Sequence, residues 1–213
     1  MQDLTQPLTI FSTGDYMATK EVAPRALADS ISVFLQHGSI LKNFKFPRLY
    51  MPNIAIAGYK PEYYADIGRK IACGDIKVFL GEGMIQGGLA MYNFDENSLT
   101  LTKATGPLKT PKQWSTIVHE ATHMIQDMKK WRMTKIEMEA DAHFSEALFL
   151  CYKGIRLSNG YMPSFDIAAR AFSSGDMKSF KKECLSMIAE VGNKYSGVLG
   201  YDDMLYKKKL DGN

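Results

Sequence analysis

The apolar residues in the first third of the chain repeat at helical spacing. Residues 22–37 predict a helix, because Pro24 lies near the start, Gly38 follows the end, and an apolar stripe runs between them. The stripe consists of Leu27, Ile31, Phe34 and Leu35. A second, shorter helix is predicted to begin at Pro61 and to end at Cys73 and Gly74.

Four segments have the pattern of β-strands. They are residues 49–56, 76–81, 88–94 and 98–103. Pro52 restricts the first of them to the edge of a sheet. The last two read as a hairpin around Asp95-Glu96-Asn97, and hydroxyl residues alternate with leucines in its second arm.

Two further helices have clear start signals. Thr110-Pro111-Lys112-Gln113 combines an N-cap threonine, a proline at the first helical position and a capping-box glutamine, and this helix should run to about Lys130. Thr134 caps the next helix, which should run to about Tyr152 and end at Gly154. The patterns predict an α+β fold in which a small twisted sheet packs on these two helices.

The chain shows no internal repeat or low-complexity linker, so we expect one domain over residues 1–213. Its core should span about 76–153, and a helical C-terminal part of about 160–210 should close the lower half of the cleft. The composition is that of an ordinary globular protein, with 46% hydrophobic and 23% charged residues. A net charge of +3 gives no reason to expect a nucleic-acid or membrane partner.

The chain also carries some information on location. No classical signal peptide and no membrane-length apolar segment is visible. The three cysteines, Cys73, Cys151 and Cys184, form no CxxC pair, which favours a reducing compartment. These features leave a cytoplasmic location and export by a leaderless route as the two alternatives.

The first of the two capped helices contains the pattern H-E-x-x-H, at His119, Glu120 and His123. Residues four apart lie on one face of a helix, so the two imidazoles can reach the same cation. Glu120 would project beside them, where its carboxylate can take a proton from an activated water. The pattern predicts a zinc site, and the competing interpretation is a partly buried helix that carries two histidines by chance.

A catalytic zinc needs a third protein ligand. Glu137, Glu139 and His143 on the next helix are chemically acceptable. Helical projection places Glu137 inside the apolar arc and Glu139 towards solvent, which favours Glu137. Asp141 would then accept the second N–H of a ligating histidine. The alternative for Glu137 is the far end of a capping box that begins at Thr134.

These residues resemble the zincin metallopeptidases, in particular the gluzincin branch, whose third ligand is a glutamate. The His119–His123 motif matches the family's first motif, and Glu137-Met138-Glu139-Ala140-Asp141 is similar to its downstream E-x-x-A-D segment. The resemblance implies Glu120 as general base, Glu137 as ligand and Asp141 as its outer partner. It also implies that residues 88–93 form the edge strand that pairs with an extended peptide. It identifies no oxyanion-stabilising residue among Tyr161, Tyr195, Tyr201 and His143.

The sequence therefore predicts a zinc-dependent metallopeptidase that hydrolyses a peptide or protein substrate, as an endopeptidase rather than an exopeptidase. One alternative is a zinc-binding protein that cleaves nothing, in which a fourth ligand such as His143 closes the site. Another is a metal-free interaction domain. A hydrolase of non-peptide amides is a variant of the enzyme hypothesis.

Overall fold

The computed structural model describes residues 20–48, 58–82, 89–103 and 107–155, together with four helical residues, Arg170, Lys182, Ser186 and Ala189. The predicted strand at 49–56 lies outside the described residues. The same holds for the predicted C-terminal part at 160–210, apart from those four positions.

The sheet of the described residues has four strands in the order β1-β2-β4-β3. Strand β1 (Lys20–Val22) pairs antiparallel with β2 (Lys77–Gly81), and β2 runs parallel to β4 (Ser98–Thr102). Strand β3 (Ala90–Asn93) pairs antiparallel with β4 and forms one edge of the sheet. The structure confirms the hairpin and the strand at 76–81, whereas β1 has only three residues and was not predicted from the pattern.

The hairpin turn follows from its asparagines. The side chain of Asn93 accepts hydrogen bonds from the backbone N–H groups of Asp95 and Glu96, at 2.8 and 3.1 Å. Asn97 has a φ of 48°, in the left-handed region that asparagine tolerates better than most residues. The turn fixes the register in which Tyr92 lies opposite Leu99.

The four α-helices between residues 20 and 155 agree with the predicted ones. They are α1 (Arg25–His37), α2 (Pro61–Cys73), α3 (Pro111–Met128) and α4 (Lys135–Tyr152), and the short 3₁₀ helix η1 (Leu41–Asn43) follows α1. The structure confirms both predicted capping boxes, at Thr110 with Gln113 and at Thr134 with Glu137. Gly74 ends α2 with a φ of 87°, a conformation that favours glycine.

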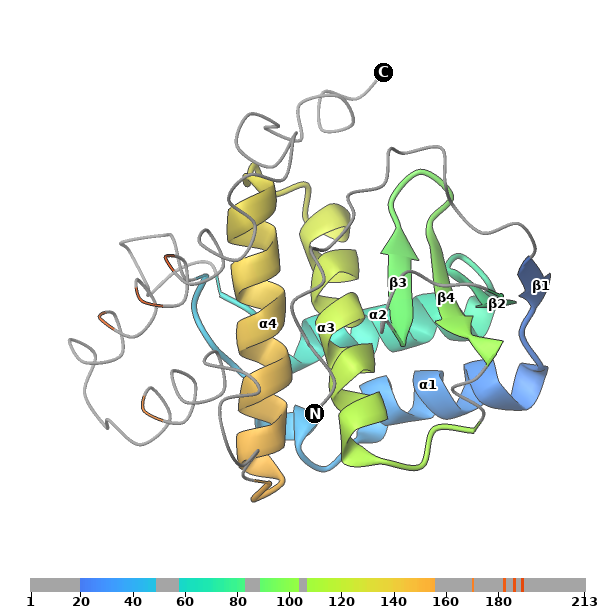
Figure 1. Cartoon of the computed structure of the whole chain (residues 1–213), viewed down its shortest axis with the longest axis horizontal. Coiled ribbons are helices and arrows are strands. Elements are labelled where there is room, and N and C mark those ends of the chain that lie inside the picture. Colours follow the sequence, from blue (N-terminus) through green and yellow to red (C-terminus); the bar gives the residue numbers. More distant parts are fainter. Residues whose placement is uncertain are drawn as a thin grey trace, which may run out of the picture.

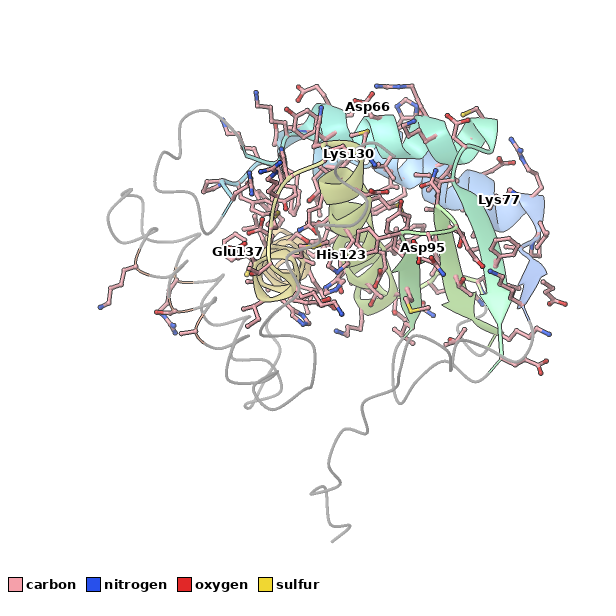
Figure 2. All side chains as sticks on the ribbon, turned by 90° about the horizontal axis from the view of Figure 1, so that it is seen from above. Asp66, Lys77, Asp95, His123, Lys130 and Glu137 are labelled. Atoms are coloured by element: carbon pink, nitrogen blue, oxygen red, sulfur yellow. The ribbon has the colours of Figure 1, made fainter. Side chains whose placement is uncertain are left out.

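The elements form two layers. Helices α3 and α4 lie side by side in one layer with the sheet, and α3 is next to the edge strand β3 (Figure 1). Helices α1 and α2 pack against each other behind them, as the view from above also shows (Figure 2). One continuous apolar core joins the layers and includes fully buried side chains from each, such as Ile31, Ile67, Leu99 and Ile125.

The architecture is therefore a mixed α+β fold with a small four-stranded sheet, as the sequence predicts at this level. Within the described part of the chain, no helix combines the length and the apolar character needed to cross a membrane. The long pair α3 and α4 carries the residues with candidate chemistry.

Candidate metal centre

Helix α3 holds the H-E-x-x-H motif in its middle, where helix packing fixes its orientation. Ile117, Val118, Ala121 and Ile125 on this helix are no more than 1% exposed. His123 and Glu120 are also buried, with 6% and 7% of their surface exposed. The imidazole rings of His119 and His123 lie 4.9 Å apart between their centroids. The motif is thus held rigidly on a half-buried helix, as the spacing predicts.

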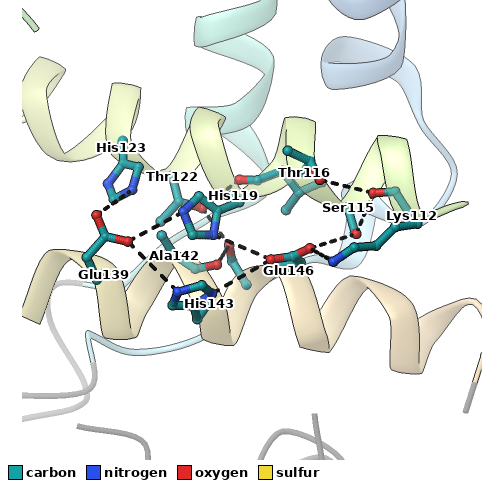
Figure 3. Close-up of polar contacts among 12 residues, drawn as sticks. Lys112, Ser115, Thr116, His119, Thr122, His123, Glu139, Ala142, His143 and Glu146 are labelled. Atoms are coloured by element: carbon teal, nitrogen blue, oxygen red, sulfur yellow. Dashed lines mark hydrogen bonds and ion pairs between the residues drawn. The ribbon is translucent and has the colours of Figure 1, made fainter. Parts of the chain in front are cut away.

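The two motif histidines converge on Glu139 of α4. The Nε2 atom of His119 lies 3.7 Å from one carboxylate oxygen of Glu139, and the Nε2 atom of His123 lies 3.6 Å from the other (Figure 3). Ligand atoms from these three residues all lie within 4.8 Å of one another. They form a group that could hold a metal ion.

The distances suit a small tetrahedral cation. Zinc–nitrogen and zinc–oxygen bonds of about 2.0–2.2 Å imply ligand–ligand distances of about 3.3–3.6 Å in a tetrahedron. The observed 3.7 and 3.6 Å lie close to this range, and they run to the two different oxygens of Glu139. Two imidazoles with one carboxylate are also a ligand set typical of zinc rather than of calcium or magnesium, which prefer oxygen ligands.

The other ring nitrogen of His119 faces Glu146. Its Nδ1 atom is buried without a hydrogen-bond partner among the described residues, and the nearest carboxylate oxygen of Glu146 is 3.6 Å away. Glu146 is itself held by Lys112, at 2.6 Å, and by the hydroxyl of Ser115, at 3.2 Å. A carboxylate behind a ligating histidine fixes the ring orientation, so Glu146 occupies the usual outer position of a metal site.

The other ring nitrogen of His123 faces Gln126. Its Nδ1 atom lies 2.9 Å from the amide oxygen of Gln126. The amide nitrogen of Gln126 donates to the hydroxyl of Tyr59 at 2.8 Å, and that hydroxyl donates to Asp141 at 2.7 Å. Burial, with the charge of Asp141 adding to it, raises the pKa of Tyr59 well above its usual value, so this phenol keeps its proton.

Negative charge accumulates next to the motif histidines. Burial opposes ionisation of Glu139, but the surrounding imidazoles of His123, His119 and His143 hold its pKa well below the usual value. The pKa of Glu146 is also well below normal, because its contacts with His119 and His143 outweigh its burial, and Lys112 acts in the same direction. A buried and a half-buried carboxylate at one place favour a nearby cation.

Without a bound metal ion, a proton on His119 supplies part of this positive charge. Burial by itself lowers the pKa of His119, but the nearby carboxylates of Glu139 and Glu146 outweigh it and raise the pKa to about 10. Burial lowers the pKa of His123 to about 4. One histidine is thus charged and the other neutral, and a metal ion would displace the proton between the carboxylates.

Glu120 lies on the side of α3 that faces the edge strand. One of its carboxylate oxygens accepts a hydrogen bond from the backbone N–H of Tyr92 in β3, at 2.7 Å. Burial raises the pKa of Glu120 to about 7, although His119 and the Tyr92 N–H act in the opposite direction. A carboxylate poised near neutral pH beside a candidate metal position can act as a proton acceptor.

The structure does not bring Glu137 to the histidines. One carboxylate oxygen of Glu137 accepts a hydrogen bond from the backbone N–H of Thr134 at 2.6 Å, and the backbone N–H of Glu137 donates to the hydroxyl of Thr134 at 3.2 Å. Glu137 is therefore the far end of the capping box that begins at Thr134, which was the alternative interpretation. Asp141 lies one turn further on and contacts Tyr59, and the position beside His123 Nδ1 belongs to Gln126.

The helical projection failed for a physical reason. Helix α4 is buried around most of its circumference, so its apolar arc does not identify the face that contacts α3. Glu139 was expected to point to solvent, yet its side chain is only 21% exposed and contacts both motif histidines. The spacing of the ionisable residues identifies this face better than hydrophobicity does. Glu139, His143 and Glu146 stand at positions i, i+4 and i+7 and therefore lie on one face of the helix.

His143 lies between the two carboxylates of the centre. Its ring lies 4.7 Å from that of His119 between centroids, and its Nδ1 atom is 3.8 Å from Glu146. Together with His119 and Glu146 it forms a second group of possible ligands. Its Nε2 atom also lies 4.0 Å from a carboxylate oxygen of Glu139, so His143 contacts a carboxylate of each group (Figure 3).

Replacing Glu146 by Gln should weaken metal binding. The variant keeps the shape of the side chain but removes the charge behind His119, and losses of this kind typically cost about 10- to 100-fold in metal affinity. Competition titration with a chromophoric zinc chelator measures the affinity. Glu62→Gln, at an exposed position on α2, is the control and should leave it unchanged. Equal affinities of the Glu146 variant and the wild type would show that Glu146 does not support the site.

A separate pocket of about 380 Å³ lies between α2, the hairpin and the end of α3. Its lining includes Ile67, Tyr92, Phe94 and Met124, but none of the motif residues. The candidate chemistry is therefore concentrated at the α3–α4 centre rather than in this pocket.

No protein-family model matches the chain, and neither a curated protein nor a solved structure matches it in sequence or fold searches.

Proposed function

We propose that the protein is a zinc-dependent peptidase, in which His119, His123 and Glu139 hold the metal and Glu120 is the general base. The observation that carries the proposal is the convergence of two Nε2 atoms on one carboxylate, at 3.6 and 3.7 Å, next to a buried carboxylate on the same helix. This ligand set corresponds to the gluzincin pattern, with Glu139 in place of the expected Glu137.

The catalytic steps follow from the positions of these side chains. A bound zinc ion would supply a positive charge that acidifies water and polarises the scissile carbonyl. Glu120 would accept the proton of the attacking water and pass it to the leaving amine. Its hydrogen bond from Tyr92 N–H holds one carboxylate oxygen in place and leaves the other for this proton transfer.

The edge strand gives the proposal a substrate class. Strand β3 lies at the edge of the sheet beside α3, and its backbone reaches Glu120 directly. The N–H of Thr102 donates to the carbonyl of Leu89, so the antiparallel alternation directs the backbone groups of Ala90 and Tyr92 away from β4. The Tyr92 N–H is taken by Glu120, which leaves the Ala90 N–H and the two carbonyls for a peptide. An extended peptide could add to this edge, next to the base. Such a binding mode favours internal peptide bonds, and hence an endopeptidase.

The direct test is cleavage of a mixture of internally quenched peptides by the full-length chain loaded with zinc. We expect fluorescence to develop, to stop on addition of a zinc chelator and to return when zinc is resupplied. Mass spectrometry of the products should show cuts at internal bonds. Stoichiometric zinc without cleavage of any peptide would contradict the peptidase and favour a zinc-binding protein that is not an enzyme.

A further inference from the structure

The amide of Gln126 can adopt only one orientation in this structure. Its nitrogen lies 3.1 Å from the carbonyl oxygen of Met138 and 2.8 Å from the hydroxyl oxygen of Tyr59. The carbonyl can only accept a hydrogen bond. The single proton of the Tyr59 hydroxyl is used towards Asp141. Both neighbours therefore require a donor, and the amide nitrogen is the only donor that Gln126 has.

This orientation has a consequence for His123. With the nitrogen committed to Met138 and Tyr59, the amide oxygen must face the imidazole, and it lies 2.9 Å from Nδ1. Two acceptor atoms cannot share a hydrogen bond, so Nδ1 must carry a proton. The neutral ring then has its lone pair on Nε2, the atom that lies 3.6 Å from Glu139.

We infer that Gln126, itself oriented by Met138, Tyr59 and Asp141, is a positioning residue that fixes His123 in its Nδ1–H tautomer before any metal is bound. The four groups come from three separate parts of the chain: the segment before α2, the last turns of α3 and the first turns of α4. Met138 contributes its backbone carbonyl, and the other three residues contribute side chains. These side chains are buried, with 2% of Gln126, 1% of Tyr59 and 1% of Asp141 exposed, so water does not compete for the hydrogen bonds.

The role of this tautomer rests on the proposed function: it presents His123 Nε2 to zinc without a prior shift of the ring proton. Its content concerns the proton on one ring and can be tested without metal or substrate. Free imidazole in water does not hold this tautomer exclusively, and pre-organisation of a ligating histidine through its second nitrogen is worth about 10- to 100-fold in metal affinity.

Long-range ¹H–¹⁵N correlation spectra of the metal-free, full-length protein distinguish protonated from unprotonated ring nitrogens. The His123 signals are assigned by their absence from His123→Gln. We expect a protonated Nδ1 and an unprotonated Nε2 in the wild type. An unprotonated Nδ1 would overturn the inference, whatever the protein binds or cleaves.

Two variants separate the parts of the arrangement. Gln126→Met keeps the volume but removes the acceptor, so the His123 ring should become a mixture of tautomers and zinc affinity should fall by about 10- to 100-fold. Tyr59→Phe leaves Met138 to orient the amide, so the tautomer should persist and the affinity should fall by a smaller factor. Retention of a pure Nδ1–H tautomer and full affinity in Gln126→Met would contradict the inference.

The outcomes are distinguishable from a failure of the proposed function. If the expected tautomer is found but the chain neither retains zinc nor cleaves peptides, the proposed function fails and the assignment of His123 stands. If Gln126→Met does not fold, as judged by circular dichroism, the wild-type spectrum and the Tyr59→Phe variant still decide the inference.

Discussion

Glu120→Gln should abolish peptidase activity while leaving zinc in place. The glutamine oxygen can still accept the hydrogen bond from Tyr92 N–H, so the local structure is expected to persist. The variant cannot take a proton from water, however, and loss of a general base typically costs about 10²- to 10⁴-fold in rate. Measured kcat/KM should fall by that factor, with zinc content unchanged.

The matched control for this variant is Glu62→Gln, which changes the same functional group at an exposed position on α2 and should retain full activity. Retained activity in Glu120→Gln, at wild-type zinc content, would refute the assigned base. The pH profile gives a second test. Glu120 must be ionised to act, so activity should rise with pH through its pKa. Burial places that pKa at about 7, and the charge of bound zinc should lower it further.

Removing zinc should lower the stability of the folded protein. Without a metal ion, the positive charges next to Glu139 and Glu146 are the proton on His119 and the Lys112 ammonium, which contacts Glu146 alone. An ion that binds only the folded state stabilises it by about 4 kcal/mol when present at 1,000 times its dissociation constant. For a chain of this size that corresponds to a rise in Tm of roughly 8–16 °C.

Thermal unfolding with and without added zinc, after complete chelation, measures this difference. The comparison variant is Glu139→Gln, which should lose most of the zinc-dependent increase because one ligand is gone. Magnesium should not replace zinc, since the site offers two imidazole nitrogens. An identical Tm in the presence of chelator and of zinc would argue that no metal belongs to this fold.

Local signals in the sequence were sufficient for the elements of the fold. The capping boxes at Thr110 and Thr134 predicted the starts of α3 and α4, and the hairpin followed from the alternation around residues 95–97. Such signals depend on neighbouring residues and can be read from one chain. The three-residue strand β1 has too short a pattern to be recognised this way, and its backbone pairs with the distant strand β2.

Part of the candidate site could be predicted from the sequence for the same reason. His119, Glu120 and His123 lie within one helix, and the structure brings the two histidines together as their spacing requires. The partner from α4 depended on how two helices face each other. Since α4 is buried on several sides, hydrophobicity could not distinguish the face of Glu139 from that of Glu137.

The outer contacts of the histidines depend on still longer separations. Gln126 contacts Tyr59 across 67 positions of the chain, and Tyr59 contacts Asp141 across 82. No periodicity links these residues. Asp141 was expected to bond a histidine directly, whereas Tyr59 and Gln126 stand between it and His123.

Metal content of the purified wild type, Glu139→Gln and Glu137→Gln, determined by elemental mass spectrometry, tests the central claim most directly. The two substitutions are chemically identical and lie two residues apart, and glutamine at position 137 can preserve the capping box. We predict about one zinc ion per chain in the wild type and in Glu137→Gln, and loss of zinc in Glu139→Gln. Loss of zinc in Glu137→Gln with retention in Glu139→Gln, or absence of zinc from the wild type after it is supplied, would contradict the proposed centre.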